Sequence, residues 1–255
     1  MRGMQTPMAP LMTSSRDNIS TIAVIPAFEE AGAIGPTVRR LPREVVDHVI
    51  VVDGGSADAT AAEAEAAGAL VIREGRRGYG RACARGAAAA GALGADIVLF
   101  LDGDGSDAAE RAGDIVGPVR RGEADLVLAH RSAAGRARAS MGLHQVFAGW
   151  AFGRLIGLMT GTTYRDMCAF RALRLETLER LGMTELTYGW NLEMQIRAAA
   201  AGLRIREVPL PYGRRRNGRS KVAGNVCGTL RASAQLLAVF VRFWRARRAH
   251  RARPT

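Results

Sequence analysis

Short apolar runs alternate with helix-like segments through the first half of this 255-residue chain, and this pattern constrains the fold more than any other feature. Each run has the length and apolar character of a buried strand. The segments between the runs are rich in alanine and have the length of helices. The alternation predicts an α/β fold with a mostly parallel central sheet, right-handed crossovers and flanking helices. The predicted strands are residues 21–27, 48–52, 69–72, 96–101 and 125–129, and the predicted helices are residues 31–41, 58–67, 79–93 and 107–121.

The second half of the chain has a different pattern. Longer helices are expected at residues 141–159 and 188–201, with short extended pieces at residues 167–170 and 205–209. We expect these elements to pack on the same domain as the first half.

Composition divides the chain into three parts. Residues 1–19 are expected to form a disordered leader, residues 20–222 one domain, and residues 223–255 an amphipathic helix with a basic tail. Six arginines lie among the last fourteen residues, and the net charge of +12 predicts attraction to nucleic acid, anionic lipid or a nucleotide. The last helix either packs on its own domain or rests its arginine-rich end on anionic lipid.

The sequence disfavours several classes of protein. Cys83, Cys168 and Cys227 are far apart and odd in number, which argues against a disulfide framework and a Cys-rich zinc site, and fits a reducing cytoplasm. No apolar run approaches the roughly 18 to 20 residues that cross a bilayer, and no signal peptide is visible at the start. We expect a chain that neither spans a membrane nor is exported.

Two carboxylates follow the fourth predicted strand. In Asp102-Gly103-Asp104 they lie two residues apart in a turn, so they can converge on one Mg²⁺ or Mn²⁺ ion that also holds phosphate oxygens. A solvated acidic turn is the alternative. Residues 26–30 and 53–58 follow the first two strands, and in parallel sheets ligands bind beyond the carboxyl ends of strands. Their shared position favours a phosphate-handling site over three unrelated turns.

A glycine-rich segment opens the third predicted helix. It resembles a dinucleotide fingerprint, but Cys83 stands where the third glycine belongs and the segment follows the third strand, so a Rossmann oxidoreductase is disfavoured. Backbone N–H groups at such a helix start can still face an anion, which predicts nucleotide contacts at Gly78 and Arg81. A simple loop-to-helix junction is the alternative.

The basic segment 211–221 carries five cations and two glycines. Charge runs of this kind are commonly solvated loops. The planar fork of arginine also suits phosphate oxygens, so the segment is a candidate to close over a bound diphosphate.

Taken in order, these motifs resemble the family 2 glycosyltransferases, in the branch of the dolichyl-phosphate mannose and glucose synthases and their bacterial polyprenyl-phosphate relatives. The resemblance covers residues 21–231 and implies a GT-A fold. The opening motif, at residues 26–30, implies contacts of Pro26, Phe28 and Glu30 with the base and ribose of a nucleotide. The second motif implies that Asp53 recognises the base, although Gly54 replaces its usual second carboxylate.

The same resemblance assigns the centre of the site. Asp102, Gly103 and Asp104 match the Asp-x-Asp metal motif, which implies a Mg²⁺ or Mn²⁺ ion held by Asp102 and Asp104 against the donor phosphates. Ser106 stands where relatives often have a Gln ligand. Arg131 falls where the family has an arginine that contacts the donor phosphate.

Three further blocks complete the resemblance. Residues 166–171 look like a variant of the family's Asp-x-x-x-Gly-Phe-Arg segment. Residues 188–193, the last of which is Glu193, match its acceptor-side helix. Arg215, Gly218, Ser220 and Lys221 match its mobile Arg-x-x-Gly-x-Ser-Lys loop. The implied donor-binding residues therefore include Arg215, Ser220 and Lys221.

The implied reaction is inverting transfer of a hexose from UDP-glucose or GDP-mannose to a polyprenyl phosphate, with Asp104, Arg131 and Glu193 as catalytic residues. A phosphate acceptor is mostly dianionic at neutral pH and needs no base, whereas an alcohol would need one, for which Glu193 and Asp166 are the candidates. The basic loop and tail favour a lipid phosphate, and so a peripheral enzyme on the cytoplasmic face of the membrane.

Two alternatives remain at this point. One is a family 2 glycosyltransferase that acts on a soluble or secondary-metabolite hydroxyl. The other is a basic nucleic-acid-binding module, which the lack of any recognised nucleic-acid-binding motif disfavours. The sequence carries no mark of an oligomeric state.

Overall fold

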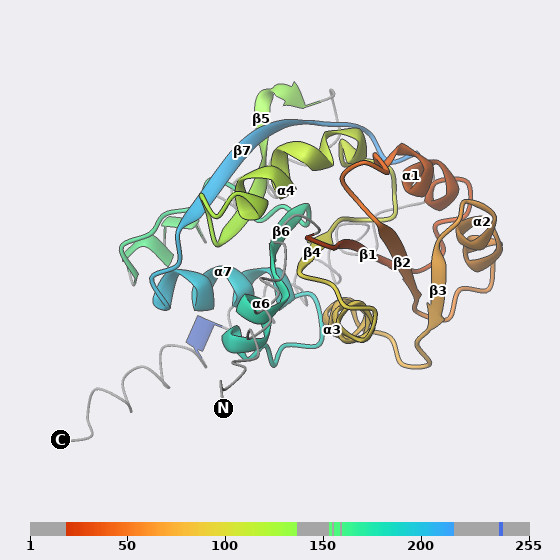
Figure 1. The fold of residues 1–255 in the computed structure, drawn as a ribbon, viewed down its shortest axis with the longest axis horizontal. Coiled ribbons are helices and arrows are strands. Elements are labelled where there is room, and N and C mark those ends of the chain that lie inside the picture. Colours follow the sequence, from red (N-terminus) through yellow and green to blue (C-terminus); the bar gives the residue numbers. More distant parts are fainter. Residues whose placement is uncertain (1–18, 137–152, 155, 159, 217–239, 242–255) are drawn as a thin grey trace, which may run out of the picture.

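The structure is a computed structural model that describes residues 19–136, 153–154, 156–158, 160–216 and 240–241. Within these residues, seven strands form one mixed sheet at the centre of the molecule (Figure 1). The strands are β1 (Thr21–Ala27), β2 (His48–Asp53), β3 (Leu70–Arg73), β4 (Ile97–Phe100), β5 (Leu126–Arg136), β6 (Arg171–Arg174) and β7 (Ile205–Tyr212), in the spatial order β3-β2-β1-β4-β6-β5-β7.

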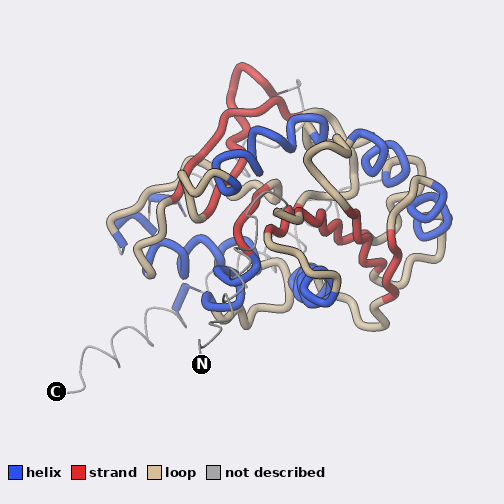
Figure 2. The backbone as a smooth tube through the Cα atoms, in the orientation of Figure 1, coloured by secondary structure: helices blue, strands red, loops and turns tan. Residues whose placement is uncertain are grey.

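Helices cover both faces of this sheet. In Figure 2 strands and helices alternate across the molecule, and the strands at the position of β5 and β7 reach its upper edge. Apolar side chains alternate between the faces, because successive residues of a strand point in opposite directions. On one face Ile22 and Val24 pack with α3 (Tyr79–Ala92), α6 (Leu175–Leu181) and α7 (Trp190–Ala200). On the other face Ala23 and Ile25 pack with α1 (Ile34–Arg40), α2 (Thr60–Ala66) and α4 (Ala112–Arg120), which follows the short 3₁₀ helix η1 (Ala109–Arg111).

One glycine sets how closely α3 lies on the sheet. A Cβ atom at Gly86 would overlap the side chain of Val24, so only glycine lets α3 pack directly over β1. Phe240, which lies in a helical piece at residues 240–241, is buried in the same apolar layer. This contact places one residue of the expected C-terminal helix on the domain, while the rest of that helix lies outside the described residues.

The strand directions create a single functional edge. β1 pairs in parallel with β2 and β4, and β5 pairs in parallel with β7, whereas β6 runs antiparallel to both of its neighbours. The carboxyl ends of β1, β2, β4, β5 and β7 therefore lie at the same edge of the sheet, which we call the carboxyl edge. No helix in the described part of the chain has the length and apolar character needed to cross a membrane.

The predicted α/β class with a mostly parallel sheet is confirmed, and the predicted elements of the first half match to within a few residues, except that β5 continues to Arg136, seven residues beyond the predicted end. The extended piece expected at residues 167–170 is wrong, because the strand begins at Arg171. The guanidinium of Arg171 donates to the carbonyls of Cys168 and Ala169, which occupies groups that a sheet ladder would use. Helix α6 was not predicted, and most of the helix expected at 141–159 lies outside the described residues.

Candidate active site

Three segments meet at the carboxyl edge: the loop after β1, the loop after β2 and the turn after β4. The order of the strands requires this, because β2 and β4 both lie beside β1. The ends of β1 and β2 are joined by the pairing of Ala27 with Asp53, and β4 runs beside β1. The amide of Glu29 donates to the hydroxyl of Ser56 at 2.8 Å, which ties the loops after β1 and β2 together. Gly103 packs against Ile34 of α1, so the turn after β4 joins the same group.

Asp104 is the most completely enclosed acid of this group. Its Oδ1 accepts the amide of Ser106 at 2.9 Å and the hydroxyl of Ser106 at 2.5 Å. Its Oδ2 is buried and has no hydrogen-bond partner among the described residues, although Nε of Arg215 lies 3.0 Å away in an ion pair. Ser106, which the sequence suggested as a metal ligand, therefore uses its hydroxyl to hold Asp104.

Asp107 is a third carboxylate in this turn, which we call the acidic turn (residues 102–107). It is buried, and sequence reasoning missed it because it was assigned to the start of a helix. The spacing of the three aspartates was the visible signal.

Burial and neighbouring negative charges raise the pKa of two carboxyls in the acidic turn, those of Asp102 and Asp107. Desolvation and the charges of Asp104 and Asp107 raise the pKa of Asp102 to about 8. Desolvation and the charge of Asp104 raise the pKa of Asp107 to about 6. Arg131 opposes both shifts, and Arg215 opposes that of Asp102. A further positive charge beside these crowded carboxyls would stabilise their ionised forms.

These residues fit a divalent cation. The donor set consists of carboxylate oxygens, which hard cations prefer, and it includes a buried oxygen of Asp104 that has no hydrogen-bond donor. Among the residues that the structure describes, no three His, Cys, Asp or Glu side chains are grouped as a complete metal cage. At phosphate-binding sites Mg²⁺ is usually held by one or two carboxylates, and substrate phosphates supply further ligands.

The residues predicted to contact the base and ribose lie at the ends of β1 and β2 and in the loops that follow. Pro26 pairs with Val52 inside the sheet, and Asp53 is buried at the end of β2, where it accepts the Ser56 hydroxyl at 2.5 Å. The guanidinium of Arg77 lies 4.3 Å from the centre of the Phe28 ring. Arg77 was not among the predicted contacts, since nothing in the sequence pairs it with a residue nearly fifty positions earlier.

Glu30 connects the loop after β1 to the basic segment. Its carboxylate is buried, and its Oε1 lies 3.7 Å from Nη1 of Arg215. Its amide donates to the hydroxyl of Thr60 at 2.8 Å. Arg215 therefore stands between two buried carboxylates, those of Glu30 and Asp104.

At the start of α3, where an anion contact is predicted, two backbone amides already donate to carbonyls of the protein, and the predicted contact at Gly78 stays a prediction. The amide of Gly80 donates to the carbonyl of Thr187 at 3.1 Å, and the amide of Arg81 donates to the carbonyl of Leu186 at 3.0 Å. A Cβ at Gly78 would lie 2.5 Å from that Leu186 carbonyl, so the glycines serve close packing against residues 185–187. The predicted contact of the Arg81 side chain stays a prediction, and its Nε is buried with no hydrogen-bond partner among the described residues.

Arg131 is held by Asp166. Its Nε donates to Asp166 at 2.6 Å, its Nη2 donates to the other carboxylate oxygen, and its guanidinium lies 5.0 Å from the centre of the Tyr212 ring. Burial disfavours both charges, but the hydrogen bonds between them prevail: the pKa of Asp166 is lowered and that of Arg131 is raised. Both members of the pair are ionised. The positive charge of Arg131 favours the ionised form of Asp102 in the acidic turn.

Glu193 has contacts of a different kind from those predicted. Its carboxylate accepts the amides of Thr184 and Glu185 at 2.9 and 2.7 Å and pairs with Arg197 at 2.9 Å. Burial raises its pKa, but the hydroxyl and amide of Thr184, the Glu185 amide and Arg197 outweigh burial, so the pKa lies below the usual value. Glu193 anchors the loop before α7.

The basic segment lies along the acidic turn as far as the structure describes it. The amide of Gly213 donates to the carbonyl of Ser106 at 2.8 Å, and the amide of Arg216 donates to the carbonyl of Asp104 at 3.0 Å. Ser220 and Lys221 lie outside the described residues.

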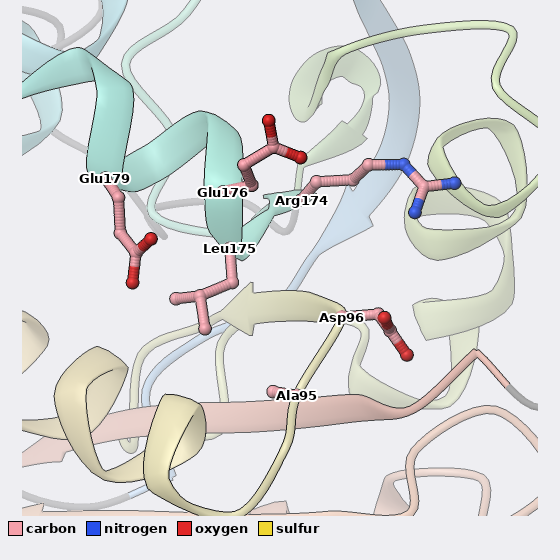
Figure 3. Close-up of a pocket in the computed structure, with 6 residues that line it drawn as sticks. All are labelled: Ala95, Asp96, Arg174, Leu175, Glu176 and Glu179. Carbon is pink, nitrogen blue, oxygen red and sulfur yellow. The ribbon is translucent and has the colours of Figure 1, made fainter.

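A separate cavity of about 240 Å³ lies at the opposite edge of the sheet (Figure 3). It is lined where β4 begins and β6 ends, by Ala95, Asp96, Arg174, Leu175, Glu176 and Glu179. None of the predicted site residues lines it.

Comparison with known proteins identifies the family of the chain. The family described as "Glycosyl transferase family 2" matches residues 22–182. An uncharacterized glycosyltransferase of Mycobacterium tuberculosis is 34% identical over 211 residues, which cover 81% of this chain and 91% of the relative. The undecaprenyl-phosphate mannosyltransferase of Micrococcus luteus is 29% identical over 218 residues, covering 81% of this chain and 89% of the relative.

The fold is also that of solved glycosyltransferases. Glucosyl-3-phosphoglycerate synthase of Mycobacterium tuberculosis, crystallised with Mn²⁺, UDP and glucosyl-3-phosphoglycerate, superposes with a TM-score of 0.65 at 23% identity, covering 93% of this chain and 86% of that one. The sheet and its flanking helices are those of a GT-A fold. With the acidic turn at the end of β4 and a family match over most of the domain, the chain belongs to glycosyltransferase family 2.

Proposed function

We propose that this glycosyltransferase moves a hexose, with inversion, from a nucleoside diphosphate sugar such as UDP-glucose or GDP-mannose to a polyprenyl phosphate. The observation that carries the proposal is the buried Oδ2 of Asp104, which accepts no hydrogen bond from the described residues, lies in an ion pair with Arg215, and sits in a turn with Asp102. The name of the Micrococcus luteus relative supports the choice of acceptor.

Asp102 and Asp104 would hold the divalent cation, Mg²⁺ or Mn²⁺. When bound, such an ion neutralises the charge that develops on the departing diphosphate. Ser106 keeps Asp104 in place through its amide and hydroxyl. We therefore assign Ser106 to the support of the metal site, and keep direct ligation for the two aspartates.

The arginines would complete the neutralisation of the diphosphate. Arg215 is within reach of both Glu30 and Asp104, and its planar fork can exchange these carboxylates for phosphate oxygens. Arg131 is held in one conformation by its ion pair with Asp166, so its guanidinium is positioned before the donor binds. On the nucleoside side, we assign Phe28 and Asp53 to the base, with Arg77 over the Phe28 ring.

The state of the two candidate bases favours a phosphate acceptor. Asp166 and Glu193 are both committed to hydrogen bonds and ion pairs, and both have lowered pKa values, which makes them weak proton acceptors. A hydroxyl acceptor needs a base, whereas a phosphate monoester has its second pKa near 6 and attacks as the dianion. A lipid phosphate places the enzyme at the cytoplasmic surface of a membrane.

The test is transfer by the purified full chain. Labelled nucleotide sugars are incubated with polyprenyl phosphate and Mn²⁺ or Mg²⁺, with and without a chelator, and the product is extracted into organic solvent. We expect a chelator-sensitive lipid product, with the anomeric configuration inverted by NMR. Asp104→Asn abolishes it, whereas Asp114→Asn, which removes a half-exposed carboxylate on α4, leaves it unchanged. Product only with a soluble acceptor, or none with any donor, would refute the proposal.

A further inference from the structure

We propose that Asp107 is a positioning residue for the metal-binding carboxylates: it fixes the main chain of Asp102 by accepting the Asp102 amide, without itself ligating the ion. The proposal rests on the function proposed above and assigns a role to a residue which that function leaves unused.

Both carboxylate oxygens of Asp107 have partners. Oδ2 accepts the backbone amide of Asp102 at 3.1 Å, and Oδ1 accepts the thiol of Cys168 at 3.7 Å. Asp107 is buried, so neither contact is readily replaced by water. A carboxylate whose two oxygens already accept protein hydrogen bonds is poorly disposed to bind a cation as well.

The direction of the Asp102 contact argues against an ordinary helix cap. A capping aspartate accepts an amide two or three residues further along the chain. Asp107 accepts an amide five residues earlier, and η1 begins at Ala109 with no side-chain capping bond from its N-cap residue Ala108. The carboxylate therefore closes the acidic turn back on the end of β4.

Asp107 also joins the acidic turn to the other functional segments. Cys168 belongs to the stretch that begins with Asp166, the residue that holds Arg131. The backbone of Asp107 forms an isolated antiparallel bridge with Tyr212, whose ring lies under the Arg131 guanidinium. A shift of Asp107 would move the Asp102 main chain relative to both arginine-bearing segments.

The need for two acceptor oxygens explains an aspartate at this position. An asparagine offers one acceptor oxygen, which suffices for the Asp102 amide but not for the thiol as well. Burying a third acid beside two others is unfavourable, so the contacts must offset that cost. If the Asp102 contact is the important one, the neutral asparagine preserves the function of the residue.

The experiment compares Asp107→Asn with Asp107→Ala in the full chain. The first readout is the exchange rate of the Asp102 amide, measured by NMR without metal. The second is the Mn²⁺ dissociation constant in the presence of UDP. We expect Asp107→Asn to keep the amide protected and the dissociation constant within about threefold of the wild type, and Asp107→Ala to weaken Mn²⁺ binding about tenfold or more, as loss of a supporting partner typically does.

Cys168→Ala is the matched control, since it removes only the partner of Oδ1 and should stay within about threefold. At saturating Mn²⁺ the kcat of Asp107→Asn should equal that of the wild type, with any loss confined to the Mn²⁺ requirement. A folded Asp107→Asn that loses either the protected amide or the Mn²⁺ affinity overturns the proposal, because charge or direct ligation would then be essential. This outcome is readable even if Asp107→Ala fails to fold.

The two proposals fail in different ways. A wild-type chain that binds no Mn²⁺ with UDP refutes the proposed function. The amide-exchange comparison is made without metal, and equal exchange of the Asp102 amide in wild type and folded Asp107→Ala refutes the role of Asp107 alone.

Discussion

The Nε atom of Arg215 lies 3.0 Å from Oδ2 of Asp104, so the buried carboxylate has a positive charge beside it before any metal ion arrives. The main chain next to Arg215 is tied to the same turn, through the amide of Arg216 and the carbonyl of Asp104. A divalent cation held by Asp104 would compete with this guanidinium, because both would neutralise the same oxygen. Metal binding and the position of Arg215 are therefore coupled.

The first prediction follows from this competition. Arg215→Gln removes the competing cation, so in the absence of donor it should strengthen Mn²⁺ binding by about threefold to tenfold, the scale of one partly screened charge contact. The same variant should lower transfer activity, since the diphosphate loses an arginine. Calorimetry measures the binding and the lipid-product assay the activity. Arg216→Gln is the control, because its amide contact with Asp104 remains. Weaker Mn²⁺ binding by Arg215→Gln would show that the two charges do not compete.

The second prediction concerns pH and the metal. The pKa of Asp102 is raised to about 8, so at pH 7 most of the metal-free protein carries a proton on this carboxyl. A divalent cation binds the ionised form, so binding must release that proton. We expect Mn²⁺ affinity to rise between pH 6 and pH 8, and calorimetry in two buffers of different ionisation enthalpy to detect proton release. An affinity that is flat over this range would contradict the raised pKa.

The same shift has a consequence for stability. The unfolded pKa of an aspartate is about 3.9. Between that value and about 8, the folded metal-free protein keeps a proton on Asp102 that the unfolded chain has lost, so the free energy of unfolding falls as pH rises. Asp102→Asn removes this dependence. Its thermal midpoint should exceed that of the metal-free wild type by more at pH 8 than at pH 5, and an equal difference at both would be the contrary result.

The fold could be predicted because its signals are local. Each strand of the first half is a short apolar run, and parallel order follows from the helices between the runs, so the carboxyl edge and its three loops could be placed in advance. The role of Asp107 could not be predicted from the sequence, because it depends on where the chain folds back after β4. Local spacing indicated that a helix starts at Asp107, whereas the folded turn brings the Asp107 carboxylate to the backbone amide of Asp102.

The same limit explains Glu193 and Arg131. The family resemblance identified both as charged groups of the site, but a charge acquires its role from its partner. The partners of Glu193 are amides of residues 184 and 185, and the partner of Arg131 is Asp166, thirty-five positions away. Such contacts are set by the packing of α7 and β5, which a single sequence does not specify.

The third prediction tests the role of Glu193. Glu193→Gln should leave kcat within about threefold of the wild type, since the proposed acceptor needs no base, and should lower the free energy of unfolding at pH 7 by about 1 to 3 kcal/mol. The lowered pKa means that the stabilisation is present above the unfolded pKa of about 4.3 and is lost as pH falls through the folded value. Urea unfolding should therefore show a smaller difference at pH 4 than at pH 7. Glu179→Gln, on the exposed face of α6, is the control. A kcat loss of a hundredfold or more in a folded Glu193→Gln would restore the catalytic role.

The last prediction concerns the fully buried guanidinium of Arg171. It donates to the carbonyls of Cys168, Ala169 and Asn191, and so joins the stretch before β6 to the first turn of α7. Arg171→Met leaves these carbonyls without their donor, and we expect a loss of about 3 kcal/mol or more in the free energy of unfolding. Arg171→Lys should recover only part of it, because one ammonium cannot span the positions that a planar fork reaches. Arg174→Met, at the other end of the same strand, is the control. Apolar packing sometimes replaces a buried charge without loss, so an Arg171→Met variant as stable as the wild type would show that the charge is dispensable to the fold.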